Sequence, residues 1–149
     1  MTKDSVAVLN GLIETLKDGE LGFEAAASDV SRPELRQVLT DFAAQRGQFA
    51  RALQYQVELT GEHPEVSGSL GGTVHRGWIN LKAAVAKRED LAVLEECERG
   101  EDAALKAFTD AVAGGELGAS RTIVEGQAIQ IRAAHDQVRA LRDGLRAAV

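Results

Sequence analysis

The sequence predicts an all-α protein, and three observations carry this prediction. Apolar residues recur at spacings of three and four along four long stretches, which is the periodicity of an amphipathic helix. Only two prolines, Pro33 and Pro64, occur in 149 residues, and both fall between segments of helical pattern. No stretch alternates polar and apolar residues as a half-buried strand would. At this length we expect a single domain over residues 1–149.

Start and stop signals bound the expected helices. Pro33 stands in a first helical turn, where proline is favoured. Gly61 ends that helix, Asp90 is a suitable N-cap for the next, and the Gly114-Gly115 pair ends it. The expected helices span approximately residues 3–28, 32–60, 90–113 and 119–147.

The connections between these helices select a topology. The first and third connections are only a few residues long, so each forces an antiparallel helical hairpin. The second connection, residues 61–89, holds a loop rich in Gly, Pro and Ser and a shorter helical stretch at 73–87. A crossover of this length makes the second and third helices parallel, which gives the up-down-down-up bundle of ferritin-like proteins. The alternative is an up-down-up-down bundle with a surface flap.

Composition restricts the classes of function. The net charge is −6, and no cluster of Lys and Arg stands free of acids, so we expect no binding of nucleic acid. No apolar run could span a membrane, and no secretory signal is visible. The single cysteine, Cys97, cannot form an internal disulfide, which favours the cytoplasm. A homodimer is expected from base rates alone, and the sequence identifies no protein partner.

Two glutamates interrupt the apolar stripe of the third helix. The stripe consists of Leu91, Leu94, Glu98, Glu101, Leu105, Phe108 and Val112. An unpaired carboxylate in a low-dielectric interior costs several kcal/mol or more. We therefore expect a neutralising group beside Glu98 and Glu101.

Polar residues near mid-length of all four helices predict a polar centre. They are Glu20, Gln45, Arg46, Glu98, Glu101, Gln127, Gln130 and His135. Counted from the turns, Glu20 should lie level with Phe42, and Glu98 level with His135.

Three interpretations of this centre remain open. In the first, Arg46 clamps buried glutamates in a network of salt bridges and hydrogen bonds, and no cofactor is expected. In the second, Glu20, Glu98, Glu101 and His135 hold one metal ion, iron or manganese, in a metal-binding protein or metal-dependent oxidase. In the third, the stripe is rotated and one of the glutamates lies in solvent.

A ferritin-type site with two iron ions is not expected. Such a site needs Glu-x-x-His on each of two helices. At the corresponding spacing this chain has Gln45-x-x-Gln48 and Gln127-x-x-Gln130, and neutral amides are poor ligands for iron. An inward-pointing Arg46 would also repel a cation. No Ser/His/Asp set or phosphate-binding glycine loop occurs either, so we expect a protein without catalytic activity.

Several short strings resemble a bacterial family of small ferritin-like four-helix bundles whose function is uncharacterised. The strings are DGE at 18–20, HRGW at 75–78, EECERGED at 95–102 and HD at 135–136. The resemblance implies a ferritin-like fold for nearly the whole chain, and it implies no catalytic residues. Taken together, we expect an uncharacterised ferritin-like bundle that acts through assembly or partner binding.

Overall fold

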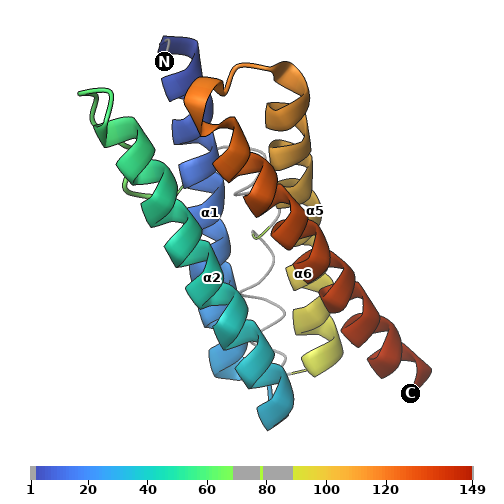
Figure 1. Ribbon diagram of the computed structural model, residues 1–149. Coiled ribbons are helices and arrows are strands. Elements are labelled where there is room, and N and C mark those ends of the chain that lie inside the picture. Colours follow the sequence, from blue (N-terminus) through green and yellow to red (C-terminus); the bar gives the residue numbers. More distant parts are fainter. Residues whose placement is uncertain (1–2, 69–77, 79–88, 149) are drawn as a thin grey trace.

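The computed structural model describes residues 3–68, 78 and 89–148. Within these residues it has long helices and no β-strand (Figure 1), which confirms the all-α prediction. The elements are α1 (Lys3–Asp29), α2 (Pro33–Glu58), α5 (Asp90–Gly114), the short 3-10 helix η1 (Gly118–Ser120) and α6 (Arg121–Ala147). The short helix expected at 73–87 lies outside the described residues, apart from Trp78. None of the described helices is long and apolar enough to cross a membrane.

The helices run up-down-down-up, as predicted. In Figure 1, α2 returns antiparallel to α1, α5 runs in the same direction as α2, and α6 returns antiparallel to α5. α1 packs against both α2 and α5, and α5 packs against α6. The alternative up-down-up-down topology is therefore wrong.

The helix boundaries follow the local signals, with one difference at Asp90. Pro33 is the first residue of α2, and α5 ends before Gly115, whose φ of 74° lies in the left-handed region that favours glycine. The N-cap of α5 is Glu89, so the N-cap expected at Asp90 is wrong. The Asp90 carboxylate instead accepts hydrogen bonds from the backbone N–H groups of Ser31 and Arg32, at 2.8 and 3.3 Å. It thereby ties the turn before α2 to the start of α5.

The apolar core is divided along the bundle axis by a charged layer. One cluster of buried apolar residues contains Phe23, Leu39, Phe42, Val93, Leu94 and Val138, and the other contains Leu9, Ile13, Leu53, Phe108, Leu117 and Ile131. On α2, Arg46 falls between the residues of the two clusters, and on α5 Glu101 does the same. The middle of the bundle is therefore charged, and both ends are apolar.

Trp78 fills a slot between α1 and α5. Its side chain is buried, and its ring meets the ring of Phe23 edge-on at 5.2 Å between centroids. A Cβ atom added to Gly22 on α1 or to Gly100 on α5 would lie 2.4 or 2.2 Å from the indole ring. These two glycines are therefore the positions that make room for the indole.

Candidate functional site

A buried ion pair occupies the middle of the bundle. The guanidinium of Arg46 donates from Nη1 and Nη2 to the two carboxylate oxygens of Glu101, at 2.5 and 2.7 Å. The side chains are 1% and 0% exposed. The Nε–H group of Arg46 faces Gln45 Oε1 at 3.3 Å, and its guanidinium carbon lies 5.3 Å from the centre of the Phe23 ring. This bidentate geometry satisfies both charges away from water.

Glu98 lies at the seam between α5 and α6 and is held by two arginines. Arg142 Nη1 donates to its Oε2, and Arg139 Nε lies 3.4 Å from its Oε1. The side chain of Glu98 is 10% exposed, so its charge is largely removed from water. Arg142 also donates to Asp143 from Nη2 at 2.8 Å, which fixes the guanidinium at the seam.

His135 on α6 is buried between two carboxylates. Its Nε2 lies 2.5 Å from Oδ1 of Asp102 on α5, and its Nδ1 lies 3.1 Å from Oδ1 of Asp136. The imidazole is 5% exposed, whereas both aspartates are more than half exposed. Glu98, Asp102 and His135 each offer one ligand atom, and these atoms lie within 4.8 Å of one another. A pair of helices thus brings two carboxylates and one imidazole together at one point.

The remaining residues predicted for the polar centre are Glu20, Gln45, Gln127 and Gln130, and of these Gln45 contacts Arg46. Glu20 binds Lys17 at 2.6 Å and packs against Gly47 of α2. Gln45 is half-buried, and its amide lies 3.5 Å from that of Gln130. Gln130 is exposed, which differs from the expectation, because the inward face of α6 passes through Gln127, Ile131 and Ala134.

Gln127 is the buried amide of α6. It donates to the backbone carbonyl of Phe49 at 3.3 Å, and its own Oε1 has no hydrogen-bond partner among the described residues. Of the eight predicted residues, Glu101, Arg46, Gln45 and Gln130 form one chain of hydrogen bonds, whereas Glu20, Glu98, Gln127 and His135 have other partners.

The four residues predicted to share a metal ion do not meet at one point. Glu101 is engaged by Arg46 through both oxygens, and Glu20 is engaged by Lys17. Glu98 and His135 do come together, and their third neighbour is Asp102, which the sequence analysis missed. The signal for Asp102 was its position four residues after Glu98, since residues i and i+4 share one face of a helix.

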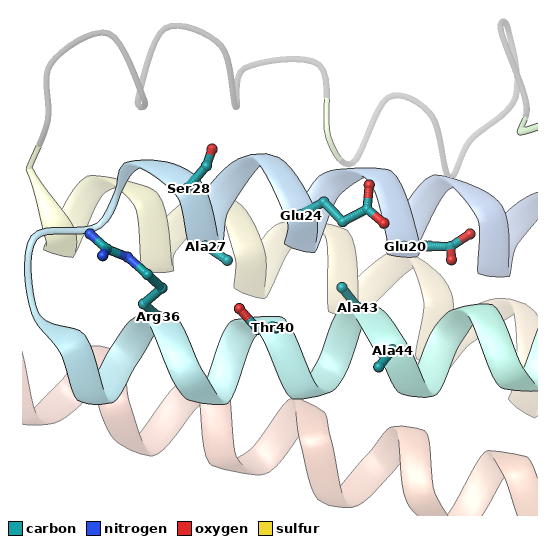
Figure 2. A pocket seen from close by; sticks show the side chains of 8 residues that line it. All are labelled: Glu20, Glu24, Ala27, Ser28, Arg36, Thr40, Ala43 and Ala44. Atoms are coloured by element: carbon teal, nitrogen blue, oxygen red, sulfur yellow. The ribbon is translucent and has the colours of Figure 1, made fainter.

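A shallow groove runs along the outer surface of α1 and α2. Figure 2 shows its lining residues, which are Glu20, Glu24, Ala27, Ser28, Arg36, Thr40, Ala43 and Ala44. Its volume is about 380 Å³. In Figure 2, Ala27 and Ala43 lie between the two helices, Arg36 extends from α2 near the turn that joins them, and Glu24 extends from α1. The sequence did not predict this groove, because it depends on the pairing of two helices.

Cys97 is a buried thiol without access to solvent. Burial raises its pKa far above the ordinary value of 9.0, and the negative charges of Glu101 and Glu96 raise the pKa further. The folded protein therefore keeps this thiol protonated and unreactive.

We expect this thiol to make stability fall in alkaline solution. In the unfolded chain it loses its proton near its ordinary pKa of 9.0, whereas the folded chain retains it. The free energy of unfolding should therefore fall by about 1.4 kcal/mol per pH unit above pH 9 from this group alone. Urea unfolding of wild type and Cys97→Ala at about pH 8 and about pH 10 measures the effect. Equal losses of stability in the two proteins would contradict this assignment.

Comparison with known proteins adds a family and a fold. The sequence profile of a family described as "Domain of unknown function (DUF2383)" matches residues 4–114. Among solved structures, a mutant of Dps1 from Mycobacterium smegmatis superimposes with a TM-score of 0.74 at 13% sequence identity, over 95% of this chain and 99% of that one. At this identity the likeness shows the ferritin-like fold alone. No curated protein matches the sequence.

Proposed function

We propose that this chain, which belongs to the DUF2383 family of domains of unknown function, is a non-catalytic ferritin-like bundle that acts through self-assembly. The resemblance to small ferritin-like bundles of uncharacterised function agrees with the family match and with the fold.

The observation that supports a non-catalytic role is the buried Arg46–Glu101 pair. A metal ion in the middle of a four-helix bundle needs lone pairs that point inward. The guanidinium of Arg46 has no lone pair to offer and carries a positive charge, and it uses both oxygens of Glu101. Glu20 contacts Lys17, Glu98 contacts Arg142, and His135 contacts Asp102. These separate contacts do not favour the predicted four-residue metal centre or an oxidase built on it.

Exposed apolar side chains support self-assembly. Tyr55 and Leu59 are 58% and 64% exposed, and their i, i+4 spacing places them on one face at the end of α2. Val66, in the segment after α2, is 69% exposed. Protein interfaces are enriched in aromatic side chains, and burial of an apolar side chain of this size contributes roughly 1.5–3 kcal/mol. We therefore assign the contact between copies to the end of α2 that carries Tyr55.

The mass of the protein in solution tests this proposal. We expect the wild type to form an oligomer in light scattering coupled to size-exclusion chromatography, and the double variant Tyr55→Ser/Leu59→Ser to elute as a monomer. The control is Ile129→Ser, which removes a still more exposed apolar side chain (72%) from α6 and should leave the mass unchanged. A wild type that stays monomeric at the highest attainable concentration would exclude self-assembly.

A further inference from the structure

We propose that the seam between α5 and α6 binds one first-row divalent transition-metal ion through Glu98, Asp102 and His135, with Asp136 as the residue that orients His135. This site lies outside the centre of the bundle, and the inference does not depend on self-assembly.

The placement of the three side chains suits a small cation. Glu98 and Asp102 are one helical turn apart on the same face of α5, and His135 faces them from α6. Their ligand atoms lie within 4.8 Å of one another. Ions of this class bind nitrogen and oxygen at about 2.0–2.2 Å, so any two ligand atoms around one ion lie at most about 4.4 Å apart. The limit of 4.8 Å exceeds this value by a few tenths of an ångström, so binding requires a small adjustment of the side chains, of which Asp102 is the exposed one.

The surroundings of His135 point to a ligand. A neutral imidazole donates one hydrogen bond only, yet both of its ring nitrogens face a carboxylate oxygen. Donation from Nδ1 to Asp136 leaves the lone pair of Nε2 directed at Asp102. A cation beside Nε2 and Asp102 Oδ1 would satisfy both acceptors. Metal-binding histidines commonly donate their second N–H group to a carboxylate in this way. Two arrangements compete with a bound ion: a neutral imidazole that donates from Nε2 to Asp102, the nearer oxygen at 2.5 Å, and an imidazolium that bridges both aspartates.

One oxygen of Glu98 is held only weakly and can serve as a ligand. Its Oε2 accepts a hydrogen bond from Arg142, which Asp143 holds in place. Its Oε1 has only the long 3.4 Å contact with Arg139, whose side chain is half exposed and can move away. Arg142 can therefore keep the carboxylate oriented while Oε1 binds an ion. The carboxylates of Glu98, Asp102, Asp136 and Asp143 carry four negative charges against the two positive charges of Arg139 and Arg142, and the difference of two matches the charge of the ion.

The ligand set selects the class of ion. Carboxylate oxygens with one imidazole suit Mn²⁺, Fe²⁺ and Zn²⁺, whereas Mg²⁺ rarely takes imidazole and Cu⁺ prefers sulfur. Three protein ligands leave positions for water, as in open metal sites. Asp102 is 59% exposed, so an ion can enter from solvent without opening of the bundle.

Calorimetric titration of the full chain tests the site. After removal of metal with EDTA, we expect Zn²⁺ and Mn²⁺ each to bind with one ion per chain and to raise the melting temperature. Asp102→Asn should weaken binding at least tenfold, and Asp136→Asn should weaken it by about 10–100-fold through loss of the oriented imidazole. The matched control is Asp110→Asn, an exposed aspartate two turns along α5, which should bind as the wild type does.

Two results would overturn the inference. Absence of saturable binding by the wild type would mean that the contact between His135 and Asp102 is a hydrogen bond and not part of a metal site. Wild-type affinity in Asp102→Asn would place the ion elsewhere, and because Asp102 is exposed, this variant is expected to remain folded. Neither result would bear on self-assembly, which is measured by mass in the presence of EDTA.

Discussion

Arg46→Met is expected to destabilise the protein by about 3–5 kcal/mol, because it leaves the charge of Glu101 buried and without a partner. For a chain of this size the loss corresponds to a fall in melting temperature of roughly 10 °C. Urea unfolding at neutral pH, followed by circular dichroism, gives the free energy directly. The control is Arg51→Met, which changes an exposed arginine of the same helix and should cost less than about 0.5 kcal/mol.

A double variant separates the effect of charge on stability from the effect of packing. Arg46→Met/Glu101→Leu removes both charges and keeps apolar volume, so it should recover most of the stability lost by Arg46→Met. Near-wild-type stability of Arg46→Met would show that Glu101 is neutralised in another way. A double variant as unstable as Arg46→Met would show that the loss comes from shape and not from charge.

Gly100→Ala is expected to displace Trp78, because the new methyl group would lie 2.2 Å from the indole ring. Overpacking of this kind typically costs about 1–3 kcal/mol, and it should exceed the gain of about 1 kcal/mol that alanine brings to a helix interior. Trp78 is the only tryptophan, so its fluorescence reports the change without labelling. We expect a shift of the emission to longer wavelength as the indole becomes exposed, together with a lower melting temperature.

Gly126→Ala is the matched control for this change. Gly126 is also inside a helix, but an added Cβ atom there meets nothing within 4 Å. This variant should be stabilised by up to about 1 kcal/mol, with unchanged fluorescence. If Gly100→Ala behaved in the same way as Gly126→Ala, the slot for Trp78 between α1 and α5 would be incorrect.

The helices and their topology could be predicted from the sequence because both depend on local properties. The 3-4 spacing of apolar residues, Pro33 and the Gly114-Gly115 pair are all readable within one or two turns of helix. The expected helix ends differ from those of the structure by at most two residues. The length of the crossover then favoured a parallel arrangement of α2 and α5 over the antiparallel alternative.

The contacts between side chains of different helices could not be predicted as accurately as the helices themselves. Counting from the turns placed Glu20 opposite Phe42, whereas Glu20 packs against Gly47. The same count placed Glu98 level with His135, and these two do come together, but it missed Asp102, the hydrogen-bond partner of His135 one turn further on. The short helix η1 between α5 and α6, together with the tilt of the helices, changes the relative heights that a straight count assumes.

The sequence by itself determined that this chain forms helices, which face of each is apolar, and that charged groups would have to be neutralised inside the bundle. Only the tertiary structure decided that Arg46 neutralises Glu101, that Asp102 joins Glu98 and His135, and that Gly22 and Gly100 receive Trp78. The physical reason is the range of the interactions. Helix periodicity and capping act within a few residues, whereas an ion pair or a ring in a slot requires a relative position of two helices to within about one ångström.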